Sequence, residues 1–99
     1  MHNKFMITVH GNDFWRAAEK IGYLAGNDIR SHDGRKLGYF LDDHVYNYDG
    51  RKIGYLKGNE VRSLPDDGLV AHIDENRSHV SGGALSDLAR AAARLLLGD

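Results

Sequence analysis

Apolar residues and glycines recur along this chain with a period of 16 residues between positions 21 and 68. Written in blocks of 16, the sequence reads IGYLAGNDIRSHDGRK from residue 21, LGYFLDDHVYNYDGRK from residue 37 and IGYLKGNEVRSLPDDG from residue 53. A fainter copy precedes residue 21, and a further copy begins at Leu69 and then diverges. A fixed period of this length is the signature of a structural repeat. We therefore predict four repeated units, the first of them degenerate, followed by a partial closing strand.

Each block contains two short stretches that favour tight turns, with apolar and aromatic residues between them. One stretch is Gly-Asn, replaced by Asp42-Asp43 in the block that starts at residue 37, and the other is Asp-Gly. Both stretches tolerate positive φ, so we predict two-residue type I′ hairpin turns at the first of them. The intervening strands of about five residues are rich in β-branched and aromatic side chains. Each unit is therefore expected to be one β-hairpin.

The turn positions set the strand register, and the register predicts which side chains share a face. With Gly26-Asn27 at the turn, Leu24 lies opposite Ile29. Because side chains alternate between the two faces of a strand, one face is expected to form the core. Its predicted pairs are Val9 with Phe14, Leu24 with Ile29, Phe40 with Val45, and Leu56 with Val61. Gly22, Gly38 and Gly54 share this face, which favours a bend or the close approach of another backbone.

The opposite face is expected to be mixed, neither a clean core nor a clean solvent face. The register places Thr8 opposite Trp15, Tyr23 opposite Arg30, Tyr39 opposite Tyr46, and Tyr55 opposite Arg62. Cross-strand pairs of this kind stabilise a sheet by roughly 0.2–1 kcal/mol each. Ile21, Leu37 and Ile53 are also predicted on this face, near the strand ends.

Residues 84–97, ALSDLARAAARLLL, predict an amphipathic helix because Ala, Leu and Arg all favour helices. Its broad apolar stripe consists of Leu85, Leu88, Ala89, Ala92, Leu95 and Leu96. Asp87, Arg90 and Arg94 form a narrow polar strip opposite, and Gly98 stands at the expected C′ position. The predicted fold is mainly β: a pseudo-fourfold tandem β-hairpin repeat over residues 1–80, with one C-terminal amphipathic α-helix over residues 84–97. That helix is expected to pack on the repeat or on a partner subunit.

Composition narrows the class of protein. The 99 residues contain no cysteine, which excludes disulfides and thiolate zinc sites. The formal net charge of −1 disfavours a dedicated nucleic-acid binder. No apolar run approaches the roughly 20 residues that span a bilayer, and the N-terminal MHNKFMITVHGNDFW lacks the apolar segment of a signal peptide. We therefore expect a cytoplasmic protein without a membrane partner, in which self-association supplements a small core.

The repeated pattern x-G-Y-L-x-G-N-x-I-R followed by D-G-R-K-x-G-Y resembles the repeats of the bacterial 4-fold beta flower proteins. The resemblance covers roughly residues 5–73 and rests on turn and packing residues. It implies hairpin petals around a pseudo-fourfold axis, and it implies no activity and no catalytic residues. Gly-Tyr hairpin repeats of the MORN type share part of the pattern, and the C-terminal helix lies outside it.

Two sets of polar residues are candidate sites. Asp13, Asp28, His44 and Glu60 share one repeat position, but we expect them to lie apart in solvent, so no metal site is predicted. The second set would bind an anion if the Asp-Gly-Arg-Lys turns crowd around the repeat axis. Alternatively, neighbouring aspartates neutralise these side chains. This candidate anion site consists of Lys20, Arg35, Lys36, Arg51 and Lys52.

A third set on the mixed face has the aromatic and arginine composition of interface centres. Alternatively, these side chains make ordinary cross-strand contacts under the chain's own helix. The set consists of Trp15, Tyr23, Arg30, Tyr39, Tyr46, Tyr55 and Arg62.

The sequence favours a binding protein over an enzyme. It contains no phosphate-binding Gly-rich loop, HExxH motif, EF-hand loop or nucleophile elbow, and we predict no catalytic residue and no cofactor. We expect a non-catalytic binding or interaction module that acts as a homo-oligomer through the aromatic face or the helix stripe. Its ligand would be an unknown protein or small molecule. The alternative is a small-ligand or anion-binding protein, including an enzyme, that uses the basic turn residues near the axis.

Overall fold

Within residues 6–98, which the computed structural model describes, the strands form one ten-stranded sheet in the order β10-β1-β2-β3-β4-β5-β6-β7-β8-β9. The four hairpins are β1 (Ile7–His10) with β2 (Asp13–Arg16), β3 (Glu19–Ala25) with β4 (Asp28–Ser31), β5 (Lys36–Leu41) with β6 (His44–Asn47), and β7 (Lys52–Lys57) with β8 (Glu60–Ser63). They are followed by β9 (Leu69–His72), α1 (Ile73–His79), β10 (Val80–Ser81) and α2 (Asp87–Leu97). The four predicted hairpins, the closing strand and the C-terminal helix are therefore confirmed. The predicted repeat domain begins at residue 1, and residues 1–5 lie outside the described residues.

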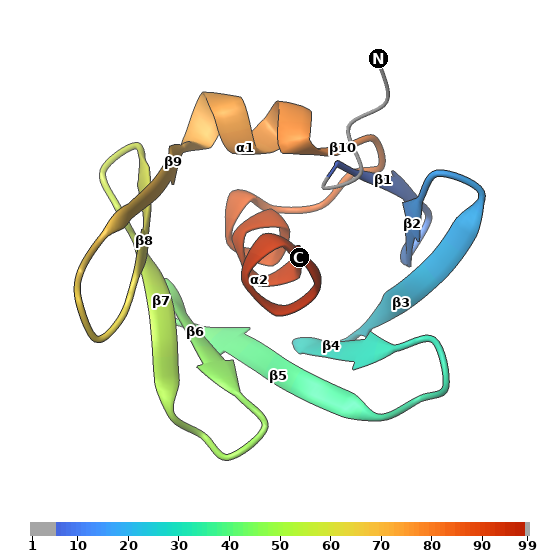
Figure 1. The fold of residues 1–99 in the computed structure, drawn as a ribbon, viewed down its shortest axis with the longest axis horizontal. Helices are drawn as coiled ribbons and strands as arrows, with labels where there is room; N and C mark the ends of the chain where they lie inside the picture. Colours follow the sequence, from blue (N-terminus) through green and yellow to red (C-terminus); the bar gives the residue numbers. More distant parts are fainter. Residues whose placement is uncertain (1–5, 99) are drawn as a thin grey trace.

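The sheet curls around α2, which occupies the middle of the molecule (Figure 1). Consecutive antiparallel hairpins surround most of the helix, and α1 spans the remaining gap between β9 and β10. The short β10 pairs in parallel with β1, with Ile7 opposite Val80, and α1 connects it to β9 at the other edge of the sheet. Neither α1 nor this parallel pairing was predicted from the sequence. Among residues 6–98, no helix has the length and apolar character that crossing a bilayer requires.

The predicted strand register is confirmed in every hairpin. Leu24 pairs with Ile29 and Tyr23 with Arg30, and the corresponding pairs recur in the other units. Asp42 and Asp43 both have positive φ, 52° and 67°, as a type I′ turn requires. In the Gly-Asn turns, positive φ falls on the glycine, for example 61° at Gly26, which is the pattern of a type II′ turn. The type I′ prediction is therefore correct for Asp42-Asp43 only.

One extra residue interrupts the pairing between successive hairpins. Ile29 pairs with Gly38 and Arg30 with Lys36, which leaves Leu37 without a partner. The same register shift recurs between the neighbouring units. Such a β-bulge bends the strand and redirects the side chain of the extra residue. Placing Ile21, Leu37 and Ile53 on the outer face was therefore wrong, because all three pack against the core.

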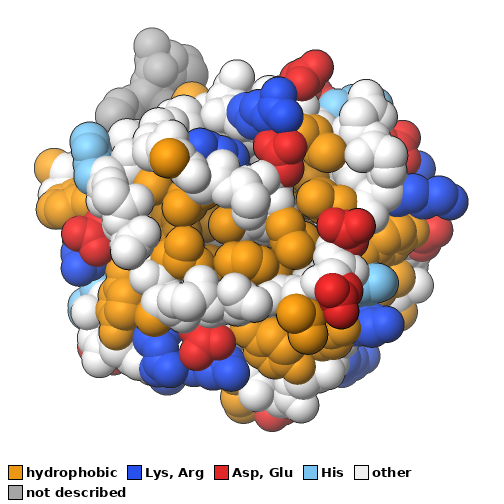
Figure 2. Space-filling view, turned by 180° about the vertical axis from the view of Figure 1, so that it is seen from behind, with side chains coloured by type: hydrophobic (Ala, Val, Ile, Leu, Met, Phe, Trp, Pro, Cys, Tyr) orange, Lys and Arg blue, Asp and Glu red, His pale blue; other side chains and the backbone are white. Residues whose placement is uncertain are grey.

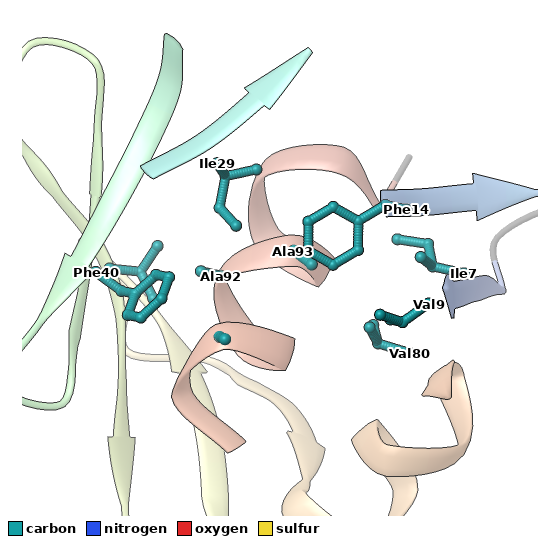
Figure 3. Close-up of a cluster of buried hydrophobic side chains, with 10 residues drawn as sticks. Ile7, Val9, Phe14, Ile29, Phe40, Val80, Ala92 and Ala93 are labelled. Atoms are coloured by element: carbon teal, nitrogen blue, oxygen red, sulfur yellow. The ribbon is translucent and has the colours of Figure 1, made fainter. Parts of the chain in front are cut away.

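The core lies between the concave face of the sheet and α2 (Figure 3). Phe14, Ile29, Val45 and Val61 are fully buried, as predicted from their register positions, whereas Leu24 and Leu56 of the same predicted set are only half-buried. Figure 3 shows the larger side chains of the sheet directed toward Ala92 and Ala93 of the helix. Large residues on the strands thus face small residues on this part of α2.

At the last turn of α2 the size relation is reversed. Three successive leucines of the helix lie against the three glycines of the repeat: Leu97 at Gly22, Leu96 at Gly38 and Leu95 at Gly54. A Cβ atom at Gly38 would lie 2.8 Å from Leu96 Cδ1 and 2.2 Å from the Tyr46 carbonyl oxygen. The glycines are therefore required by the close approach of helix and neighbouring strand.

Helix α2 packs inside its own chain, which answers the open question about its partner. It begins at Asp87, three residues later than predicted, because the Ser86 side chain accepts a hydrogen bond from the Ala89 backbone N–H and caps it. Ala89, Ala91, Ala92 and Ala93 are all buried, so α2 is enclosed on every side. Gly98 is the C-cap residue with φ −74°, a right-handed conformation, and not a left-handed C′ residue.

The polar strip of α2 faces α1 and β10. Arg90 is buried and donates hydrogen bonds to the carbonyl oxygens of Val80 at 2.7 Å and Gly83 at 3.3 Å. Arg94 donates to the Asn76 side chain of α1 at 3.4 Å. The narrow polar strip of α2 is therefore hydrogen-bonded to α1 and to the segment around β10, which close the roll.

The glycine contacts predict a specific loss of stability. Gly38→Ala places a methyl group where helix and strand already touch, so we expect the free energy of unfolding to fall by about 1–3 kcal/mol in a urea titration. Gly68→Ala is the matched control, because its Cβ would meet its nearest atom at 3.5 Å, and its effect should stay within about 0.5 kcal/mol. Equal stability of the two variants would contradict the close-approach explanation.

Candidate functional site

The third predicted set lies on the convex, outer face of the sheet, on strands from β2 to β8. Its seven side chains, which we call the aromatic band, are all half-buried. They alternate with the core residues and therefore point away from α2. The alternative in which the chain's own helix covers this face is wrong, because the helix packs on the glycine face. The aromatic band consists of Trp15, Tyr23, Arg30, Tyr39, Tyr46, Tyr55 and Arg62.

Ion pairs follow the band at the junctions between units. Lys20 Nζ lies 3.2 Å from an Asp13 carboxylate oxygen, and Lys36 Nζ lies 3.5 Å from Asp28. Arg30 also pairs with Asp28, at 3.1 Å, and donates to the Gly34 carbonyl oxygen. In the fourth unit Arg62 makes the corresponding contacts, at 2.9 Å to Glu60 and 2.8 Å to the Asp67 carbonyl oxygen. The carboxylates of this repeat position are therefore occupied by neighbouring cations.

The four metal-capable side chains that share this repeat position belong to different units around the roll. Among the residues that the structure describes, no group of three or more His, Asp or Glu side chains is placed to hold a metal ion.

The third unit, β5 with β6, differs from its neighbours. His44 stands where the other units have a carboxylate, and Tyr46 stands where the second and fourth units have arginine. The Tyr46 ring stacks on Tyr39 with centroids 4.7 Å apart and planes 8° apart. The His44 ring lies 6.1 Å from Tyr55 of the next strand. This unit therefore presents a run of aromatic rings in place of an arginine–carboxylate pair.

The predicted anion site does not form around the axis, because α2 fills that position. The loops after β4 and β6, which carry the Asp-Gly-Arg-Lys turns, point outward at the rim (Figure 1). Arg35 and Lys36 instead line a pocket of about 440 Å³ together with Leu37 and Tyr48. Lys20, in the preceding unit, pairs with Asp13. Arg51 and Lys52 stand at the next Asp-Gly-Arg-Lys turn, between β6 and β7. The five basic residues are thus distributed over three successive turns of the chain.

Most of the apolar stripe of α2 packs against the core of the fold. The face seen in Figure 2, on the side where α2 begins, carries hydrophobic side chains at its centre. The half-buried Leu85 and Leu88 belong to this start of the helix. Leu41, next to the Asp42-Asp43 turn, is 49% exposed.

A second pocket, of about 360 Å³, lies at the start of α2 and was not predicted. Arg77, Asp87 and Arg90 line it, with Gly82, Leu85 and Ser86. Arg77 donates two hydrogen bonds of 2.9 Å to the two Asp87 carboxylate oxygens, and this pairing holds the pKa of Asp87 below its usual range. The pairing joins α1 to α2, which no local sequence pattern could indicate.

The ionisation of the Tyr55 phenol, which belongs to the band, can be followed in a titration. Its hydroxyl donates to the Asp67 carboxylate, and this hydrogen bond raises the pKa of Tyr55 above its usual value. Asp67→Asn removes the acceptor charge that favours the neutral phenol, so the pKa of Tyr55 should fall toward its ordinary value. Asparagine tolerates the positive φ of 58° at this position. Phenolate absorbance during an alkaline titration measures the change, and Asp66→Asn, one residue away, should leave the titration unchanged.

Comparison of the chain with protein-family models, with curated proteins and with solved structures found no match. A functional proposal therefore rests on the geometry of the outer face and of the two pockets described above.

Proposed function

We propose that this protein is a non-catalytic binding module that acts as a homo-oligomer, with the aromatic band as its contact surface. The observation that carries the proposal is the half-burial of all seven band residues on a face that neither α1 nor α2 covers. Tyr, Trp and Arg are enriched at interface centres because they combine a large contact area with hydrogen-bonding groups. The helix stripe, the other surface considered, is largely used inside the fold.

A second copy of the chain is the proposed occupant of the band. The formal net charge of −1 produces little repulsion between copies. Ion pairs beside the band carry both signs of charge, with Lys20 next to Asp13 and Lys36 next to Asp28. Two such faces can therefore meet without placing one sign of charge against itself.

Membership of the bacterial beta flower family and a cytoplasmic location are part of the same proposal. Four successive hairpins around one axis support the family resemblance. The absence of cysteine from the sequence is compatible with the location.

Light scattering at high micromolar concentration tests the self-association. We expect the wild type to be oligomeric and Tyr46→Arg to be monomeric, because the substitution replaces a stacked ring with a charge. Arginine occupies the equivalent position in two other units, so the variant should keep its circular dichroism spectrum. Leu41→Lys is the control, because Leu41 is exposed and is not a residue of the band, and this variant should remain oligomeric. A monomeric wild type, or an oligomeric Tyr46→Arg variant, would refute the proposal.

Anion or small-ligand binding is a second candidate, favoured by the pocket that Arg35 and Lys36 line. Two cations beside the half-buried Leu37 and the exposed Tyr48 provide contacts for an anion with an apolar part. We expect phosphate compounds and nucleotides to raise the melting temperature in a thermal shift assay. Lys36→Ala should abolish that shift, whereas Lys57→Ala, outside the pocket, should retain it. A shift that persists in Lys36→Ala would exclude this pocket.

A further inference from the structure

The junctions between hairpin units share one charge arrangement. The first residue of β2 or β4 is an aspartate, and the side chain of a lysine in the next strand reaches it: Lys20 pairs with Asp13, and Lys36 with Asp28. The pairing across each junction is equivalent, since Asp13 lies opposite Tyr23 and Asp28 opposite Tyr39. Each of these junctions therefore contains a built-in carboxylate beside a lysine and a tyrosine.

The third junction keeps the lysine and the tyrosine but has a histidine at the repeat position of the two aspartates. His44 lies opposite Tyr55 at the position of the two aspartates, and Lys52 stands at the position of Lys20 and Lys36. Lys52 is exposed, and within residues 6–98 no carboxylate lies within 4.0 Å of its ammonium group. The cation that an internal carboxylate neutralises in the two preceding junctions is therefore left for solvent in this one.

Aromatic residues lie on the strands next to this lysine. Lys52 pairs across the strands with Tyr46, whose ring stacks on Tyr39. His44 lies 6.4 Å from Tyr46 and 6.1 Å from Tyr55, between the two tyrosines. The Nδ1 atom of His44 lies 2.8 Å from the Asp42 carbonyl oxygen, which only accepts hydrogen bonds, so Nδ1 donates and the ring orientation is held. Within the described part of the chain, the junction thus combines a lysine that no carboxylate pairs with and stacked aromatic rings on the adjacent strands.

We propose that the third junction binds a carboxylate-bearing ligand, with the carboxylate beside Lys52 and an attached ring or apolar group against Tyr46 and Tyr55. The inference rests on the proposed function, because it uses the aromatic band, and it names the chemistry of the group that the band receives. A carboxylate is favoured over other anions because a carboxylate neutralises the equivalent lysine in each of the two preceding junctions. An external group here replaces an internal one of the same kind.

Benzoate is the probe, and benzamide is its uncharged analogue of nearly the same shape. In a ¹H–¹⁵N NMR titration of the full chain, benzoate should shift the amide signals of residues 44–46 and 52–55, and benzamide should bind more weakly. His44→Asp restores the carboxylate of the sibling units and should weaken benzoate binding on the order of fivefold, as should Lys52→Ala. Lys20→Ala removes a lysine that is already paired and should leave the binding constant unchanged. All three substitutions lie at half-exposed or exposed positions of the fold.

Equal binding of benzoate and benzamide, or wild-type affinity in both His44→Asp and Lys52→Ala, would overturn the inference. The self-association proposal is tested separately by light scattering. Loss of association in Tyr46→Arg without benzoate binding to the wild type would refute the carboxylate site and leave the interface standing. Benzoate binding to a strictly monomeric wild type would support the carboxylate site and refute the interface.

Discussion

The structure depends on enclosing one helix inside a curled sheet. An α-helix with its side chains is roughly 10–12 Å across, so a sheet of short strands can surround it only by bending sharply and by approaching closely. The repeated bulge supplies the bend, because one unpaired residue between hairpins turns each strand pair relative to the last. The repeated glycine supplies the close approach, and a leucine of α2 fills the space at each one. The bulge and the glycine both recur every 16 residues, so the repeat provides both the curvature of the sheet and its close packing on the helix.

Enclosure also explains why the helix is amphipathic although it is buried on every side. The sheet covers the apolar stripe, and the remaining side faces α1 and β10, where backbone carbonyl groups are not all used in strand pairing. Arg90 satisfies two of them, at Val80 and Gly83. A buried polar group is tolerated when it is hydrogen-bonded, and here the bonds also join the last helix to the strand that closes the roll.

Sequence reasoning predicted the hairpins because their signals are local. Two adjacent turn residues set the register of each hairpin, and the register then indicated the buried residues of the second strands, from Phe14 to Val61. It failed where structure depends on distant residues. The pairing of Ile7 with Val80 joins segments more than 70 residues apart, and β10 has only two residues, too few for a periodic pattern. Ile21, Leu37 and Ile53 were misplaced because strict alternation cannot represent a bulge. The composition of the aromatic band was predictable, whereas its ion pairs across the bulge needed the observed register.

The match between helix and repeat limits how this architecture can grow. Successive residues of an α-helix are separated by about 100° around its axis. Leu97, Leu96 and Leu95 accordingly face three successive hairpins, one residue for each unit. An open solenoid lengthens when a gene duplication adds a repeat, because each new unit stacks on the end of the array. Here the existing hairpins and α1 already surround α2, so a duplicated hairpin would have no free side of the helix to pack against. The circumference of the helix therefore limits the number of repeats.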